Sequence, residues 1–321
     1  MARAKLPKKR HALMVMLAAV LGALGLWLYT PDAPRAALVA RYQRSPADRI
    51  DVAGLGLHLR DDGPRDAPAI LLLHGFGASL HTWEPWAEDL RRDHRVVRLD
   101  LPGFGLSDAE PAGDYSDERG VAILVALLDR LGIDRATVVG NSLGGRLAWR
   151  LAAAHPERVS RLVLISPDGF ASPGFDYDRP AEVPASLQLM RYVLPAPLVR
   201  MSLEPAYADP ARLSEDLVTR YRDLMLAPGI RAAMLDRMEK TVLVPPEPLL
   251  ARITAPTLLL WGQQDQMIPV RNAQDYLAVL PDARLQVFPD LGHVPHEEAP
   301  DRSLAVLRGF LVAAGEDPAT R

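Results

Sequence analysis

Ser142 lies in the stretch VVGNSLGG, where Gly140 precedes it and Gly144 and Gly145 follow it. An apolar run that reads as a strand comes before this serine, and a helical pattern with one apolar face comes after it. A serine in a sharp strand-to-helix turn has its hydroxyl pushed out above the sheet edge, and its neighbours must be small because the backbones crowd there. The alternative is a purely structural turn, since no Lys follows the glycines to make a nucleotide-binding loop. The context favours a nucleophile.

Such a serine needs a base to take its proton and a carboxylate to orient that base. His293 and Asp265 each follow a short apolar run late in the chain, at the end of a predicted strand. The order Ser142, Asp265, His293 is the one expected for a serine on a strand–turn–helix unit. Asp168 is the rival acid, because it also follows an apolar run. We expect a triad of these three residues, with Asp265 preferred to Asp168.

Other histidines fit the role of the base less well. His81, His94 and His155 lie in polar contexts typical of a surface, and His296 comes one helical turn after His293. His74 is expected to hold its own turn.

Two backbone N–H groups are predicted to form an oxyanion hole. The stretch HGFGAS follows a predicted strand and can offer the N–H of Phe76, while Leu143 adjoins the nucleophile. Each such donor is typically worth about 2.7–4 kcal/mol in the transition state. For substrate binding we expect the side chains of Phe76, Met190, Met201 and Val294.

Composition bounds the class of protein. The 321 residues suffice for one large domain or two modest ones, and 49% hydrophobic with 24% charged residues is typical of a globular chain. The net charge of −3 gives no reason to expect nucleic acid as a partner. The absence of cysteine excludes thiol nucleophiles, disulfides and thiolate metal sites. We expect neither a metal nor a cofactor.

Short apolar runs alternate with longer amphipathic ones, which predicts an α/β fold with a mainly parallel sheet and helices on both faces. The predicted strands are Ala69–Leu73, Arg95–Leu99, Ala136–Gly140, Arg161–Ile165, Pro256–Leu260 and Leu285–Phe288.

Residues 169–248 interrupt this alternation, because they contain no clear strand and many Pro, Met and Leu residues. An insertion of this length is more often a lid over a site than a plain loop. We therefore divide the chain into a core (50–168 and 249–321) and a helical cap (169–248). The methionines of the cap can line an adaptable pocket or form its own small core, and for most of them taken singly the second interpretation is the better one: Met190, Met201, Met225, Met234 and Met238.

The N-terminus predicts a membrane anchor. Five basic residues precede the uncharged run 12–29, which as a helix spans roughly 27 Å, close to the hydrocarbon thickness of a bilayer. We expect residues 1–30 to anchor the chain by a single pass, with the N-terminus cytoplasmic and the catalytic domain on the outer side. A cleaved signal peptide with secretion is the alternative. Residues 31–49 read as a linker.

With these motifs in place, the chain resembles the α/β-hydrolase superfamily over roughly residues 50–315. The matching segments are HGFGAS, DLPGFGLSD, GNSLGG, WGQQDQMIP and GHVPHEEAP. The resemblance implies an eight-stranded, mostly parallel sheet with a helical cap. Haloalkane dehalogenases and epoxide hydrolases are similar but carry an aspartate nucleophile, so Ser142 argues against both.

Within the superfamily, the serine esterase and lipase branch fits best. The resemblance then implies cleavage of carboxylic esters with an apolar acyl group through an acyl-enzyme on Ser142. The alternative is a carbon–carbon hydrolase of meta-cleavage products, whose elbow is similar but which usually has a Trp where this chain has Val294. A cation in the pocket facing a substrate carboxylate, such as Arg146 or an arginine of the cap, would favour that alternative. A non-catalytic binding protein of the same fold is the third hypothesis.

Overall fold

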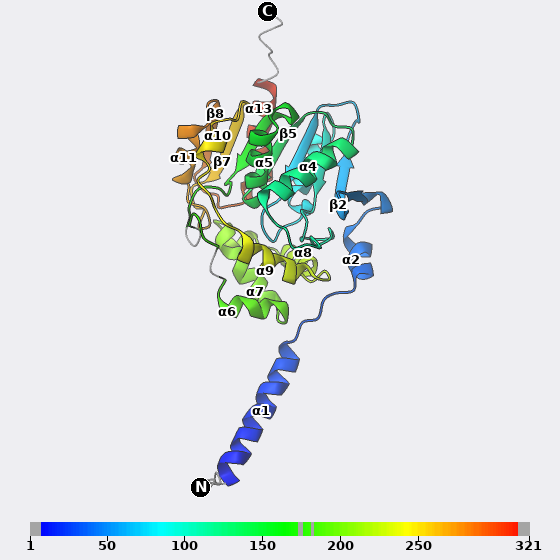
Figure 1. Ribbon diagram of the computed structural model, residues 1–321, viewed down its shortest axis with the longest axis vertical. Coiled ribbons are helices and arrows are strands. Elements are labelled where there is room, and N and C mark those ends of the chain that lie inside the picture. The colour runs from blue at the N-terminus through cyan, green and yellow to red at the C-terminus, as the bar shows by residue number, and fades with distance from the viewer. Residues whose placement is uncertain (1–7, 173–175, 181–182, 314–321) are drawn as a thin grey trace, which may run out of the picture.

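A computed structural model describes residues 8–172, 176–180 and 183–313 of the chain. Within that part, eight strands form one sheet in the order β1-β2-β4-β3-β5-β6-β7-β8 (Figure 1). The first two pairings are antiparallel, and all later ones are parallel. The strands are β1 (Arg49–Val52), β2 (Leu55–Asp62), β3 (Ala69–Leu73), β4 (Arg95–Leu99), β5 (Ala136–Asn141), β6 (Val159–Ile165), β7 (Thr257–Gly262) and β8 (Ala283–Phe288).

The six predicted strands are all present, with ends within two residues of the prediction. Their apolar runs fit a sheet that is covered on both faces, and the side chains of Ile70 to Leu73 in β3 are fully buried. The β1–β2 hairpin was not predicted, because its strands mix charged and apolar residues. Its turn uses left-handed backbone at Ala53 and Gly54, the conformation that a two-residue hairpin loop requires.

Helices cover both faces of the sheet. The first face carries α4 (Asp117–Arg130) and α5 (Leu143–Ala154), which pack their leucines on the strands. The second face carries α3 (Glu84–Leu90) and α13 (Pro300–Ala313), whose aromatic and aliphatic side chains form a separate buried cluster. The shorter helices of the core are α10 (Glu247–Leu250), α11 (Asn272–Val279) and α12 (Pro295–Glu298).

Four helices between β6 and β7 lie together at one end of the sheet (Figure 1). We call them the cap helices: α6 (Ala185–Gln188), α7 (Ala196–Leu203), α8 (Glu215–Met225) and α9 (Ile230–Lys240). Between residues 169 and 248 the described residues form no strand, only the isolated bridges of Tyr177 with Leu243 and of Pro180 with Val242. The cap helices therefore stand at the carboxyl end of β5, above Ser142.

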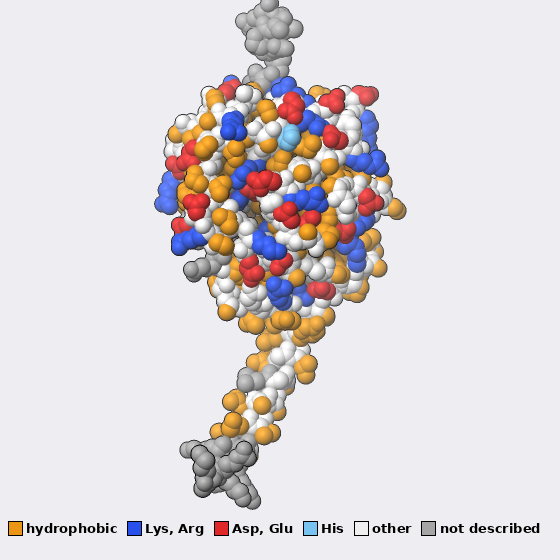
Figure 2. Space-filling model, in the orientation of Figure 1, with side chains coloured by type: hydrophobic (Ala, Val, Ile, Leu, Met, Phe, Trp, Pro, Cys, Tyr) orange, Lys and Arg blue, Asp and Glu red, His pale blue; other side chains and the backbone are white. Residues whose placement is uncertain are grey.

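The N-terminal helix α1 (Lys8–Leu28) projects away from the body of the molecule (Figure 1). Figure 2 shows hydrophobic side chains along it and over the adjoining end of the cap. The predicted single-pass anchor is nevertheless not borne out, because none of the described helices is both long and apolar enough to cross a membrane. The topology that rested on the anchor has no support.

The predicted linker 31–49 is also corrected, because most of it is folded. It contains α2 (Arg35–Tyr42), which buries Leu38 and Tyr42 against the core, and a 3-10 turn at Pro46–Asp48. Arginines of this segment make ion pairs with the folded core and cap, as Arg41 does with Asp223 and Arg44 with Asp62.

Candidate active site

Ser142 occupies a strained turn between β5 and α5. Its backbone has φ 52° and ψ −119°, a conformation that costs a non-glycine residue about 1–3 kcal/mol. The flanking glycines leave no room for a side chain: a Cβ on Gly140 would lie 2.2 Å from the Gly144 carbonyl oxygen, and one on Gly144 would lie 2.3 Å from the Leu73 carbonyl oxygen. Small residues therefore flank the serine for the predicted reason, because the backbones crowd there.

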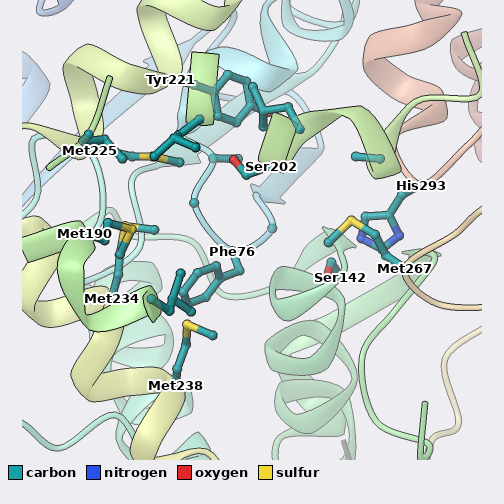
Figure 3. Close-up of a pocket in the computed structure, with 18 of the residues that line it drawn as sticks. Phe76, Ser142, Met190, Ser202, Tyr221, Met225, Met234, Met238, Met267 and His293 are labelled. Carbon is teal, nitrogen blue, oxygen red and sulfur yellow. The ribbon is translucent and has the colours of Figure 1, made fainter. Parts of the chain in front are cut away.

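His293 and Asp265 meet beside this turn. The Nδ1 atom of His293 lies 2.8 Å from Oδ2 of Asp265, and both side chains are buried. The other carboxylate oxygen accepts hydrogen bonds from the N–H groups of Met267 and Ile268, which fixes its orientation. The Nε2 atom has no hydrogen-bond partner among the described residues. In Figure 3 the imidazole and the Ser142 hydroxyl face one another at one side of the pocket.

Asp168, the rival acid, lies in a different network. Its carboxylate is 3.5 Å from Arg146, which also pairs with Asp117 at 2.7 Å. Burial raises the pKa of Asp168 above its ordinary value, although the guanidinium opposes the shift. Its N–H donates to the Ser142 carbonyl oxygen at 3.1 Å. Asp168 thus supports the backbone of the turn, and Asp265 is the carboxylate that contacts His293.

The two predicted oxyanion donors belong to the segment after β3 and to the start of α5. Phe76 follows β3 and lines the pocket, and Leu143 is the first residue of α5, so its N–H has no acceptor within the helix. His74 holds the loop before Phe76, because its Nδ1 contacts the Gly75 carbonyl oxygen at 2.7 Å and its Nε2 accepts the Leu101 N–H at 2.9 Å. This agrees with the role expected for His74.

Above these groups lies a pocket of about 790 Å³, in the upper part of the range for small-molecule sites. Its walls are apolar, and its polar groups are hydroxyls, one amide and the His293 imidazole. No Asp, Glu, Lys or Arg of the described chain lines it. Of the predicted substrate-binding residues, Phe76, Met190 and Val294 line the pocket. Met201 does not, and its side chain is 62% exposed, because α7 turns Leu198 and Ser202 inward instead.

Methionines contribute more of the pocket wall than expected. Four of the five cap methionines line the pocket: Met190, which was expected there, and Met225, Met234 and Met238. Met225 and Met234 also pack in the buried core, so they fit both interpretations. Met267, outside the cap, also lines it and lies beside His293 in Figure 3. Flexible thioether side chains give such a wall an adaptable shape.

Asn141 is a site residue that the motif analysis missed. Its amide donates to the carbonyl oxygens of Ile165 and His293, each at 3.1 Å, and so ties the serine turn to the histidine loop. A Cβ on Gly75 would lie 2.8 Å from its side-chain oxygen, so the same amide also packs against the loop before Phe76. The only sequence signal was its place next to Ser142.

The cap also holds the histidine loop. The His293 N–H donates to the Ala206 carbonyl oxygen at 2.8 Å. Glu297, one turn later, accepts hydrogen bonds from the hydroxyls of Tyr207 at 2.6 Å and Tyr221 at 3.0 Å, and pairs with Arg220 at 3.1 Å. Burial raises the pKa of both tyrosines, which keeps them protonated as donors. No short motif marks these contacts, because they join residues about 70–90 positions apart.

The placement of His81 on the surface is wrong. Its side chain is buried near Arg60 and Tyr42, and desolvation lowers its pKa to about 3. His155 and His94 are both partly exposed, with 39% and 16% of their side chains accessible. His296 is buried and stacks on Trp83, which keeps it away from Ser142.

Within the described residues, no group of three or more His, Asp and Glu is placed to hold a metal ion.

The chain is similar in sequence and in structure to known hydrolases. A family model described as the alpha/beta hydrolase fold matches residues 68–300. The 2-hydroxy-6-oxononadienedioate/2-hydroxy-6-oxononatrienedioate hydrolase of Cupriavidus pinatubonensis is 32% identical over 252 residues, or 74% of this chain and 84% of that protein. The crystal structure of a membrane phospholipase A has a TM-score of 0.73 at 27% identity and covers 96% of this chain and 100% of its own. A 2-hydroxy-6-oxo-6-phenylhexa-2,4-dienoate hydrolase from a Rhodococcus strain has a TM-score of 0.71 at 25% identity, with 82% and 97% covered.

Proposed function

Because the chain belongs to the α/β-hydrolase fold family, we propose that it is a serine hydrolase whose nucleophile is Ser142. His293 Nε2 takes the hydroxyl proton as Ser142 Oγ attacks the acyl carbon, and it then gives that proton to the leaving oxygen. Water attacks the acyl-enzyme with the same base, and the proton returns to Ser142 as the acid departs. Asp265, at 2.8 Å from Nδ1, orients the imidazole and stabilises its charged form.

The N–H groups of Phe76 and Leu143 would receive the oxyanion of each tetrahedral intermediate. The N-terminus of α5 adds to this role, since its unpaired N–H groups favour negative charge. The groups that carry the reaction are thus backbone and side chains of the described core.

We propose that the substrate is a carboxylic ester with an apolar acyl group, and the uncharged wall of the pocket is the observation that carries this. Burial of an acyl chain there removes apolar surface from water, and each Å² removed contributes roughly 25 cal/mol of favourable free energy. The structural neighbour named a membrane phospholipase A supports the proposal, because a phospholipase A cleaves an acyl ester.

Carbon–carbon hydrolysis is the second candidate, and the names of the curated relatives favour it over ester cleavage. The substrates in those names carry one or two carboxylates, and a buried carboxylate needs a paired cation. The cation considered for this role, Arg146, is engaged by Asp117 and by the carbonyl oxygen of Val242, and it does not line the pocket.

A direct comparison of substrates tests the proposal. We expect p-nitrophenyl octanoate to be cleaved with a kcat/KM at least about a hundredfold above that for a 2-hydroxy-6-oxodienoate, since the latter leaves its charge unpaired. Ser142→Ala should lower kcat for the ester by roughly 10⁴-fold or more without loss of the fold, as judged by circular dichroism. Faster cleavage of the dienoate would establish the second candidate instead, and full ester activity in Ser142→Ala would refute the assignment of the nucleophile.

A further inference from the structure

The end of the N-terminal helix reaches the active-site pocket. Leu28, the last residue of α1, is one of the residues that line the cavity, whereas the preceding Trp27 is 80% exposed. We propose that residues 28–33, which we call the strap, form part of the substrate site and set the length of acyl chain that it admits. The proposal rests on the ester hydrolysis proposed above.

The first half of the strap is bonded to the loop between α6 and α7. The Thr30 N–H donates to the Tyr192 carbonyl oxygen at 2.8 Å, and the Thr30 hydroxyl accepts the Leu194 N–H at 3.2 Å. Leu194 lines the pocket together with its neighbour Val193. This part of the wall is therefore held in place by the strap.

The second half of the strap is bonded to the turn between α8 and α9. The Ala33 N–H donates to the Leu226 carbonyl oxygen at 2.8 Å. The carboxylate of Asp32 pairs with Arg231 at 2.6 Å and accepts the Gly229 N–H at 3.2 Å. The strap thus crosses from one half of the cap to the other.

Arg231 carries this connection into the pocket wall. Arg231 is only 4% exposed, and its guanidinium donates to the carbonyl oxygen of Met190 at 3.3 Å as well as to Asp32. An ion pair that holds a buried guanidinium is costly to break, because the cation would be left without its partner. The position of Met190 therefore depends on Asp32.

The strap lies where the tail of a bound acyl group would end. Figure 3 shows Met190 and Met225 across the cavity from Ser142 and His293. An acyl group attached to Ser142 would extend along the methionine wall towards Met190 and Leu28. Short acyl groups would end before reaching this wall, and long ones would contact it.

The test measures the ratio of kcat/KM for p-nitrophenyl laurate to that for p-nitrophenyl butyrate in the full chain. In Leu28→Trp, a larger side chain takes up space at the far wall, and we expect the ratio to fall about tenfold or more. In Asp32→Asn, which keeps the shape but removes the ion pair, we expect a fall of a few-fold. Asp290→Asn is the matched control, because it removes an exposed ion pair with Arg302 outside the pocket, and it should keep the wild-type ratio.

A binding measurement separates this inference from the proposed reaction. In a Ser142→Ala background, binding of an uncharged fluorescent long-chain ester such as the methyl ester of cis-parinaric acid should weaken about tenfold when Leu28→Trp is added. If the wild-type chain cleaves no ester but this loss of binding is seen, the ester function fails and the role of the strap stands. An unchanged ratio and unchanged binding in Leu28→Trp, with urea midpoints near that of the parent, would overturn the strap proposal.

Discussion

Asp265 and Asp168 both lie near the serine turn, but their side chains have different partners. Asp265 contacts the imidazole of His293 and accepts hydrogen bonds from two backbone N–H groups, an arrangement that suits the orienting role proposed for it. Asp168 faces Arg146 and lies under the turn. Both follow strands, and only their partners distinguish them.

Exchange of each carboxylate for an amide should separate the two roles. We expect Asp265→Asn to lower kcat for p-nitrophenyl butyrate by about 10⁴-fold, because the imidazole loses its orienting charge. Asp168→Asn should leave kcat near the wild-type value but lower the free energy of unfolding by about 1–3 kcal/mol, since buried Arg146 loses one of its two carboxylate partners. Steady-state kinetics and urea unfolding measure the two effects. A larger loss of kcat in Asp168→Asn would reverse the assignment of the acid.

At the scale of elements, α12 and the cap helix α8 are joined through one buried carboxylate. Glu297 on α12 gathers two tyrosine hydroxyls and a guanidinium from the cap, only four residues after His293. The loop that carries the base is therefore held by the element that also walls the pocket. We therefore expect the position of the cap and the placement of the imidazole to be coupled through these contacts.

Glu297→Ala should reveal this coupling. It leaves the buried hydroxyls of Tyr207 and Tyr221 without their acceptor, so the free energy of unfolding should fall by about 2–4 kcal/mol, and kcat should fall with it. Glu297→Gln, which keeps an acceptor oxygen, should recover most of the stability. Glu215→Ala is the control, because its pair with Arg200 is exposed and worth at most about 1 kcal/mol. Equal effects in the two alanine variants would argue against the coupling.

At the scale of the whole molecule, burial of neutral histidines links folding to pH. Desolvation lowers the pKa of His81 and of His296 to about 3, from an ordinary value of 6.5. The unfolded chain therefore binds protons below pH 6.5 that the folded chain does not. The stability from keeping both rings neutral is complete above about pH 6.5 and is lost progressively as the pH falls towards 3, by up to about 1.4 kcal/mol per pH unit for each ring.

Removal of one ring should flatten this acid dependence. We expect His296→Gln to reduce the slope of unfolding free energy against pH by about 1 kcal/mol per pH unit between pH 6 and pH 4, whatever it does to stability at pH 7.5. Urea unfolding at a series of pH values gives the slope. His155→Gln, at a position where 39% of the side chain is exposed, should keep the slope of the wild type. A slope that His296→Gln leaves unchanged would mean that this ring is protonated in the folded chain.

Much of the fold was predictable because its signals are local. Six strands, the helix that follows Ser142 and the glycines of that turn follow from apolar runs and from backbone crowding over a few residues. The expected order of serine, aspartate and histidine along the chain likewise indicated which late residues were candidates for the acid and the base. The β1–β2 hairpin escaped because its strands carry charges, and α2 escaped because its composition is that of a linker.

The sequence by itself determined the strand–turn–helix unit that strains Ser142, and it narrowed the acid to two candidates. Only the tertiary structure decided that Asp265 contacts His293, that Arg146 is engaged outside the pocket, that His81 is buried, and that no charged side chain of the described residues lines the cavity. It also brought Leu28 to the pocket wall. The physical reason is that burial and pairing depend on contacts between segments tens to hundreds of residues apart. A local pattern of side chains does not indicate which distant segments come into contact.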